Sequence, residues 1–484
     1  MIGTLAFRQL LVRKRRSLFL LLGFSLGVAV MIVLLSVGEA MLDQSRDASL
    51  VGGGELTVLP LGIDVEAMRT GGIGALFFGI DRARFLVREA LGGRRHHDVV
   101  RTVSPNVEGK LLYLRRGSGV LPIRAGGEIP SRAAAVGAGL ELRAGTWSDS
   151  PSDSAFIAPS AQQLYDQIDR WHIPAGSDST WAEWHYFNVV SSPREWWYVT
   201  YLVGGDIRGT RWGGELLLTH RRPDGLYRRY VTRIPASQVS FDTVHADLRL
   251  GRSAIEQRDG SYRVLALSEA AGEPIKIDLH LVPASGRYFP PVELGGEGLV
   301  SGYAVPAVSG TASGQICLRS RCQILSQVPA YHDHNWGVWR GVTWEWGSGS
   351  GAKLSILYGG VAGPNSASGS SARSPFFLTV FDSLGMQQVL RFEQILYRGS
   401  RPAAGGSSTA SPAEFVLQSS READTLNVRV RVLDALATGM GEGRFRRFFL
   451  QMRGHFTISG RLLGRTVSDT GSGFFETYVG SHPR

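Results

Sequence analysis

Cysteine and charge are the two things that this sequence has little of. Its 484 residues include two cysteines, Cys317 and Cys322, and that pair is too sparse for a zinc site. Charged residues make up 19% and hydrophobic residues 43%, a balance that supports a packed core and argues against global disorder. The formal charge is +10, but the arginines are spread thinly, so nucleic acid is not expected as a partner.

The two cysteines flank a short turn in the stretch "ICLRSRCQI". With Ser320 in the middle, the stretch is typical of a hairpin whose strands bring the two sulfurs together. Outside the cytoplasm a disulfide between Cys317 and Cys322 is permitted, and we favour it; two ordinary thiols are the alternative.

Only one apolar run is long enough to cross a bilayer. It extends from Ser17 to Gly38 without a charge, and about 22 residues at ~1.5 Å rise span roughly 33 Å. Basic residues precede the run and acidic residues follow it. This order predicts a cytoplasmic segment over 1–16 and a single-pass helix over 17–38 in a bacterial inner membrane, with the bulk of the chain periplasmic. A cleaved signal peptide is the alternative, although its apolar region is usually ~7–15 residues long.

Residues 39–145 predict a small extracytoplasmic α+β domain. "GGGELTVLP" begins a strand, "DRARFLVREAL" (81–91) has a helical pattern, and "VVRTVSPNV" and "GKLLYLRR" favour strands. Together with "LAFRQLLVRKRRSLFLLLGFSLGVAVMIVLLS", these motifs resemble the start of FtsX-like or MacB-like ABC-transporter permeases. The resemblance implies the inner membrane and ABC transporter subunits as partners, although the later spans of those permeases are absent from this chain.

The rest of the chain has the pattern of antiparallel sheet. Residues 146–174 predict a linker, with a helix that ends before Pro174. Beyond them, stretches such as "IKIDLHLVP" and "LNVRVRVLD" alternate between apolar and polar residues, which is the period of a strand. One barrel rarely needs so many residues, so we expect two tandem barrels, over 175–328 and 329–484. The predicted fold class is therefore mainly β.

The stretch "YHDHNWGVWRGVTWEWG" (331–347) is the richest in candidate chemistry. On a strand, His332 and His334 share one face with Trp336, and residues between them lie on the other. Two such histidines can bind one metal ion, but a third ligand is needed. The remaining histidines, among them His185, are scattered along the sequence, so no metal is expected.

Acid–base chemistry on an apolar substrate is a second interpretation of this stretch. Protonation of an alkene requires a neutral carboxyl in a dry pocket, for which Asp333 and Asp382 are candidates. Aromatic rings would stabilise the resulting cation. The expected cavity residues are Tyr331, Trp339, Trp344, Trp346 and Trp197. A third interpretation is structural: buried histidines and aspartates often only satisfy the polar atoms of Trp and Tyr.

Four motifs resemble the AttH-like, hydroxyneurosporene synthase (carotenoid 1,2-hydratase) family over about 175–484. They are "EWHYFN" (183–188), "EWWYVTYLVGG" (195–205), "YHDHNWG" (331–337) and "GSGFFETYVG" (471–480). The resemblance implies two lipocalin-like barrels and the addition of water to a carotene double bond without a cofactor. It matches His334 and Trp336 to the family's H-x-W pair. The family's later Tyr-x-Asp pair has Val380 and Asp382 as its counterpart.

Two functions follow from these interpretations. In the first, the chain is a hydro-lyase of the hydratase type, in which Asp382 or Asp333 donates a proton, His334 orients water and Trp336 lines the cavity. In the second, the barrels bind a lipophilic, polyene-like or isoprenoid-like molecule without converting it, as an accessory component of an ABC-type export system.

Overall fold

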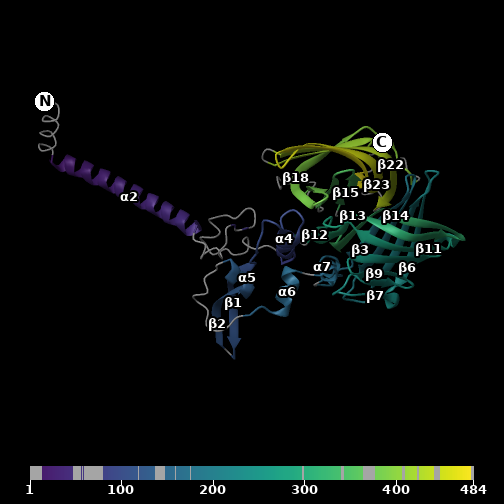
Figure 1. The fold of residues 1–484 in the computed structure, drawn as a ribbon, viewed down its shortest axis with the longest axis horizontal. Coiled ribbons are helices and arrows are strands. Elements are labelled where there is room, and N and C mark those ends of the chain that lie inside the picture. The colour runs from purple at the N-terminus through teal and green to yellow at the C-terminus, as the bar shows by residue number, and fades with distance from the viewer. Residues whose placement is uncertain are drawn as a thin grey trace. The chain divides into compact units, whose positions relative to one another are not determined.

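A computed structural model describes residues 14–46, 56, 58, 80–117, 119–136, 148–158, 160–174, 176–296, 299–339, 343–362, 376–405, 409–421, 424–440 and 447–480. The chain divides into two compact units (Figure 1). The N-terminal unit comprises Met1–Phe78 and Arg101–Asp153, and the barrel unit comprises Gly79–Val100 and Ser154–Arg484.

The N-terminal unit contains one long helix and a hairpin. The predicted apolar run lies within α2 (Lys14–Arg46). Within the residues that the structure describes, no helix is found with the length and apolar character that a membrane crossing requires. Strands β1 (Asn106–Arg116) and β2 (Gly119–Glu128) pair in antiparallel fashion and precede α5 (Pro130–Ala135). The strand predicted at "GGGELTVLP" lies almost wholly outside the described residues.

The helix predicted over 81–91 is present as α4 (Ile80–Gly92), but it belongs to the barrel unit. Its Phe85 ring packs edge-on against Tyr288 with the centroids 5.6 Å apart, and the Tyr288 hydroxyl donates a 2.9 Å hydrogen bond to Glu89. Because of these contacts Gly79–Val100 belongs to the barrel unit, so the predicted α+β domain over 39–145 is divided between the two units.

The first sheet of the barrel unit has twelve antiparallel strands, in the order β6-β5-β4-β3-β14-β13-β11-β10-β9-β8-β7, with β12 paired to β13. The strands are β3 (Trp181–Ser192), β4 (Glu195–Gly205), β5 (Trp212–Arg221), β6 (Tyr227–Pro235), β7 (Val239–Phe241), β8 (Leu248–Leu250), β9 (Ser253–Arg258), β10 (Ser261–Ser268), β11 (Ile275–Pro283), β12 (Phe289–Gly296), β13 (Leu299–Leu318) and β14 (Arg321–Val338). Two 3₁₀ turns, η2 (Ala236–Gln238) and η3 (Ala270–Gly272), join some of them. The sheet curls until β5 meets β8 and β6 meets β10, which makes a nearly closed barrel around an apolar core.

The second sheet is a closed antiparallel barrel of eight strands, green to yellow in Figure 1. Its strands are β15 (Thr343–Gly351), β16 (Ser355–Ala362), β17 (Phe377–Asp382), β18 (Gly385–Arg398), β21 (Glu414–Arg421), β22 (Asp424–Met440), β23 (Arg447–Leu462) and β24 (Arg465–Gly480). A short antiparallel pair, β19 (Arg401–Pro402) and β20 (Ala410–Ser411), falls between β18 and β21 in the sequence. The prediction of a mainly β chain with two antiparallel barrels is therefore confirmed.

The division between the barrels lies later than predicted. Strand β14 pairs with β13 on one side and with β3 on the other, so "YHDHNWG" belongs to the first sheet and not to the second barrel. A boundary at 328/329 would cut this strand in two. The error has a physical cause: β14 is 18 residues long, far beyond the usual strand of about 5–6 residues.

The disulfide is confirmed. Cys317 and Cys322 are direct cross-strand partners beside the turn between β13 and β14, with their Cα atoms 3.9 Å apart, and their sulfurs are bonded. The disulfide therefore closes this hairpin near its tip.

The predicted linker contains two helices, α6 (Pro151–Ile157) and α7 (Ala161–Asp169). Helix α7 begins with a capping box, in which the Ser160 side chain accepts from the Gln163 amide and the Gln163 side chain accepts from the Ser160 amide. Its apolar side chains enter the first barrel's core: Leu164, Tyr165 and Ile168. The last residue of the helix, Asp169, is thereby carried into the barrel interior.

Candidate functional site

The strand β14 presents two different sets of side chains on its two faces. His332, His334 and Trp336 point into the first barrel, as the alternation of a strand predicts. Tyr331 and Asp333 point the other way, and Tyr331 packs in an aromatic cluster shared by the two barrels. Catalytic roles for His334 and Asp333 at one reacting atom are therefore excluded, because the strand separates them.

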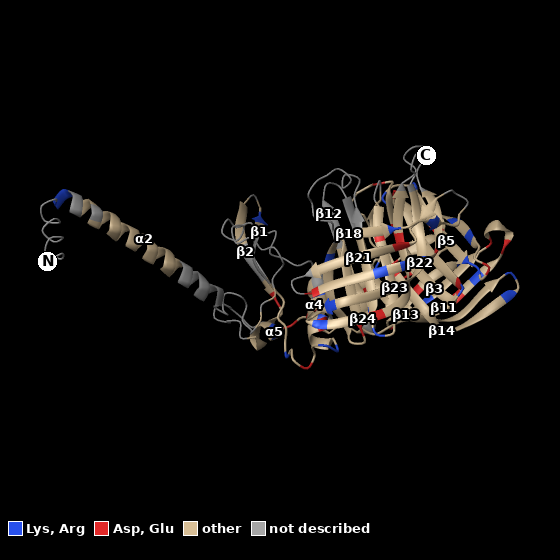
Figure 2. Ribbon diagram, turned by 90° about the horizontal axis from the view of Figure 1, so that it is seen from above, with Lys and Arg blue, Asp and Glu red and all other residues tan. Residues whose placement is uncertain are grey.

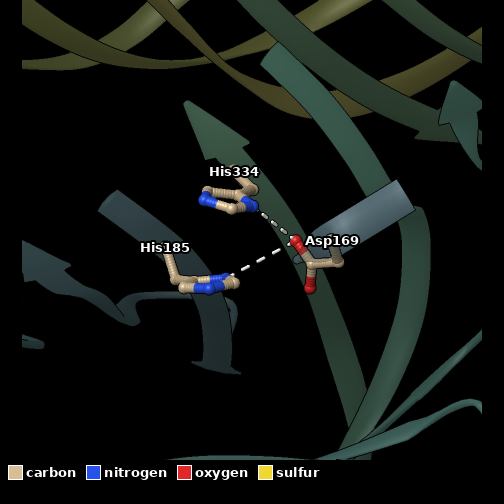
Figure 3. Close-up of side chains that lie close together, drawn as sticks. All are labelled: Asp169, His185 and His334. Carbon is tan, nitrogen blue, oxygen red and sulfur yellow. Dashed lines mark ion pairs between the residues drawn. The ribbon is translucent and has the colours of Figure 1, made fainter. Parts of the chain in front are cut away.

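The inward face gathers three histidines and one aspartate with no exposed surface. His185 on β3 lies directly opposite His334 on β14. Asp169 reaches both rings: its Oδ1 lies 2.9 Å from His334 Nδ1 and 3.6 Å from His185 Nδ1 (Figure 3). Its Oδ2 lies 3.0 Å from His332 Nε2 and accepts a 2.7 Å hydrogen bond from the Tyr262 hydroxyl. One carboxylate thus lies among three imidazoles.

A second carboxylate continues this cluster toward the surface. Glu183, which is buried, places Oε1 2.9 Å from His334 Nε2 and 2.9 Å from His172 Nδ1. The backbone N–H of His172 also donates to this carboxylate. The His172 ring stacks on Trp336 with centroids 4.0 Å apart, and its side chain is 22% exposed. The cluster therefore runs from the barrel interior to a half-buried histidine.

Burial and neighbouring charges act in opposite directions on these groups. Burial lowers the pKa of His334, but the contacts with Asp169 and Glu183 outweigh it and raise that pKa to about 9. His185 lacks a comparable pair of carboxylates, so burial and the neighbouring His334 hold its pKa well below the usual range. Burial raises the pKa of Asp169, but the surrounding histidines lower it further than burial raises it. The interior thus favours a negative Asp169 with a positive partner.

The outward face centres on Asp333, which is 3% exposed. Its Oδ2 accepts a 2.7 Å hydrogen bond from the Tyr331 hydroxyl, and its Oδ1 accepts one of 2.7 Å from the Asn335 amide. Trp346 of the second barrel donates its indole N–H to the Tyr331 hydroxyl at 2.8 Å. Both barrels therefore contribute to this acidic site.

A second buried carboxyl lies beside it. Glu476 on β24 is the cross-strand partner of Trp346, and it accepts hydrogen bonds from Trp344 Nε1 at 3.1 Å and Gln451 Nε2 at 3.4 Å. Burial, with the nearby Glu476 charge, raises the pKa of Asp333 to about 8 against the effect of its hydrogen bonds. Burial raises the pKa of Glu476 to about 7. Asp333 thus favours its neutral form near pH 7, and Glu476 can serve there as acid or carboxylate.

Asp382 does not join either cluster. It lies at the turn between β17 and β18, where it accepts from Arg95 at 2.6 Å and from Gln387 at 2.7 Å. Burial raises its pKa, but Gln387, the Leu384 amide and Arg95 together hold that pKa below its usual value. Its hydrogen-bond partners among the described residues are Arg95, Gln387 and the Leu384 amide, and a carboxylate with these partners is a poor proton donor. The prediction that Asp382 completes the site with His334 is wrong.

The other predicted cavity residues fall into two groups. Tyr331, Trp344 and Trp346 belong to the aromatic layer between the barrels. Trp339 donates its indole N–H to the Ala182 carbonyl and packs beside that layer, whereas Trp197 stacks on His220 inside the first barrel's core. Trp197 is therefore core and not cavity rim.

Asp169, Glu183 and His185 were not predicted as site residues. A signal was present for two of them: alternation along "WAEWHYF" places Glu183 and His185 on one face of β3. Nothing in the sequence indicated that β3 lies against β14, about 150 residues away in the chain.

Fold and site together define an antiparallel β protein of two barrels with buried acid and histidine clusters. No family model matches the chain, and no curated protein matches it in sequence. Solved structures that it is similar to include a protein from Nitrosomonas europaea described as a putative AttH, at 13% identity and TM-score 0.43 over 63% of this chain and 99% of that one. CghA with Sch210972 matches at 10% identity and TM-score 0.43, over 65% and 95%. Kievitone hydratase from Nectria haematococca matches at 14% identity and TM-score 0.41, over 64% and 94%.

At such identities and TM-scores, the function has to be argued from the chain's own residues. The predicted likeness of residues 1–145 to ABC-transporter permeases gains no support from these comparisons.

Proposed function

We propose that this chain is an acid catalyst that adds water to a carbon–carbon double bond of an apolar, polyene-type molecule. The observation that carries the proposal is the dry carboxyl of Asp333, held among aromatic side chains of both barrels. A carboxyl that is neutral near pH 7 can donate a proton, and apolar burial is what keeps it neutral.

The reaction needs one acid and one base. Asp333 gives its proton to one alkene carbon, and the cation that forms on the other carbon is stabilised by the faces of Tyr331 and Trp346. Water adds to that carbon and gives a proton to the Glu476 carboxylate, which is available because the pKa of Glu476 is about 7, below that of Asp333. Return of a proton to Asp333 completes the cycle, with water as the only addition.

The test is conversion of acyclic polyenes by the purified full chain, followed by mass spectrometry. We expect a product heavier by one water from the unaltered chain, and none from Asp333→Asn. Asp382→Asn is the matched control, since that carboxylate lies at a turn with Arg95, and it should leave conversion unchanged. Circular dichroism checks that both variants fold. Conversion that survives in Asp333→Asn would overturn the assignment.

A second candidate function is binding of a lipophilic molecule without conversion. The amide nitrogen of Asn188 supports it, because this atom is buried and has no hydrogen-bond partner among the described residues, and Asn188 is the cross-strand neighbour of Tyr331. A polar group on an otherwise apolar ligand would satisfy the nitrogen. Quenching of tryptophan fluorescence by a polyene that is recovered unchanged would favour this function.

A periplasmic location and partnership with ABC transporter subunits rest on the N-terminal sequence alone. Protease treatment of intact spheroplasts tests the location. Digestion of the barrel unit is expected for an exported chain, and complete protection would contradict export.

A further inference from the structure

We propose that the first barrel holds a divalent transition-metal ion, of which zinc is the best fit, bound by Asp169, His185, His332 and His334. Three donor atoms lie close enough together to hold one ion: Asp169 Oδ1 lies 2.9 Å from His334 Nδ1 and 3.6 Å from His185 Nδ1. His332 Nε2 lies beside them as the fourth donor, 3.3 Å from His185 Nδ1 and 3.0 Å from the other oxygen of Asp169. Ligands about 2.0–2.1 Å from a tetrahedral ion lie about 3.3 Å from one another. The observed separations bracket that value.

The outer hydrogen bonds turn the free nitrogens of His332 and His334 toward Asp169. His332 Nδ1 lies 3.1 Å from the Tyr186 carbonyl, an acceptor, so Nδ1 carries the hydrogen and Nε2 faces Asp169. His334 Nε2 lies 2.9 Å from Glu183, so Nε2 carries the hydrogen and Nδ1 faces Asp169. A carboxylate or carbonyl behind the imidazole is the usual support of a metal-bound histidine.

When His334 is neutral and its hydrogen is on Nε2, the lone pair of Nδ1 faces a lone pair of Asp169 Oδ1. Asp169 Oδ1 and His334 Nδ1 lie 2.9 Å apart, yet neither atom has a hydrogen bond of acceptable angle among the described residues. Both are fully buried, where an unsatisfied polar atom costs free energy. An ion between them would satisfy both, and its two positive charges would balance the charges of Asp169 and Glu183.

The backbone explains how the ligands meet. His332 and His334 are two residues apart on β14, so their side chains share a face, and His185 is the direct partner of His334 on β3. Asp169 arrives from the end of α7. His185 has to adjust most, because its ring is nearly parallel to that of His334, at 18° with centroids 4.1 Å apart, and must turn to aim Nδ1 at the ion.

Four protein ligands with no exposed surface make a closed site, which is the form of structural zinc sites. The ion would fasten α7 to β3 and β14 from inside the barrel. It lies on the opposite face of β14 from Asp333, so this proposal does not depend on the proposed function.

The main alternative is that a proton takes the place of the ion, with the His334 imidazole charged. Metal content distinguishes the two. The full chain, purified without chelator, is analysed by mass spectrometry for metals, stripped with a strong chelator, and titrated with Zn²⁺ or Co²⁺. We expect about one ion per chain, the visible absorption of four-coordinate cobalt, and a rise in melting temperature on reloading.

Three variants test where the ion binds. His332→Gln and Asp169→Asn should each lose bound cobalt, and Glu183→Gln, which acts only through His334, should weaken affinity by about 10- to 100-fold. His455→Gln is the control, because that histidine is exposed on β23, where its ring hydrogen-bonds to Ser472; it should bind as the unaltered chain does.

A folded, unaltered chain that takes up no zinc and gives no cobalt absorption would overturn the proposal in favour of a protonated His334. Equal binding by folded His332→Gln and Asp169→Asn would overturn the site, because the ion would then lie elsewhere. The cobalt spectrum of the unaltered chain keeps the test decisive even if a variant fails to fold.

Discussion

Replacement of Glu183 by alanine tests the inner cluster most directly. The Glu183 carboxylate is 1% exposed and accepts from the backbone N–H of His172 at 2.9 and 3.0 Å, from its ring at 2.9 Å, and from His334 Nε2 at 2.9 Å. Its removal leaves a buried imidazole and a backbone N–H without an acceptor. Breaking a buried, hydrogen-bonded charge pair in this way costs about 3–5 kcal/mol. We therefore expect Glu183→Ala to lower the free energy of unfolding by about that amount.

The assay is denaturant unfolding of the full chain, followed by tryptophan fluorescence, since Trp171 and Trp336 both lie against the histidine cluster. Glu215→Ala on β5 is the matched control. Its partner Arg233 is 3.5 Å away and 88% exposed, so the loss should stay below about 1 kcal/mol. A loss for Glu183→Ala no larger than that of the control would refute the view that the cluster is a buried, mutually dependent network.

Three further predictions concern other parts of the barrel unit. A Cβ on Gly302 would lie 2.2 Å from the Trp336 indole, so Gly302→Ala should lower the free energy of unfolding by about 1–3 kcal/mol in the same assay, and an unchanged value would contradict the close packing. Loss of the disulfide in Cys317→Ser/Cys322→Ser should cost about 2 kcal/mol, because the loop it closes is short; a loss above about 4 kcal/mol would point to a role beyond loop closure. The pKa of Asp333 is about 8 when folded and about 4 when unfolded, so the folded state binds more protons and stability falls as pH rises through this range. Unfolding measured from pH 5 to pH 9 should show that decline, and Asp333→Asn should flatten it; an equal decline in both would assign it to other groups.

Much of this fold follows from short-range patterns. The alternation in "IKIDLHLVP" becomes β11, with Ile275, Ile277 and Leu279 buried and Lys276 exposed between them. The period of two also divides the faces of β14 correctly. Lys, Arg, Asp and Glu are interspersed along the barrel strands, as the thin spread of charge in the sequence suggests (Figure 2). Such patterns are local, and the backbone enforces them residue by residue.

The site was harder to predict because pairing between distant strands decides it. From the sequence alone a metal is not expected, because no third ligand lies near His332 and His334 in the chain, whereas the register of β3 against β14 brings His185 opposite His334. Asp169 was hidden in a stretch with the composition of a linker, and only the packing of α7 carries it inside. Asp382 was favoured through a family motif. Its neighbour Arg95 could not be foreseen, because the sequence predicted residues 39–145 to be a separate domain, whereas Gly79–Val100 belongs to the barrel unit.

The two faces of β14 carry different clusters, so the number of residues in this strand is fixed. Deletion of a single residue just before Tyr331 would send the histidines toward the second barrel and Asp333 into the first barrel, because every later side chain changes face. Among chains of this lineage we therefore expect length differences to collect at the exposed turn of Arg319 and Ser320, while this strand changes by substitution alone. An insertion tolerated within it would imply a bulge that restores the alternation.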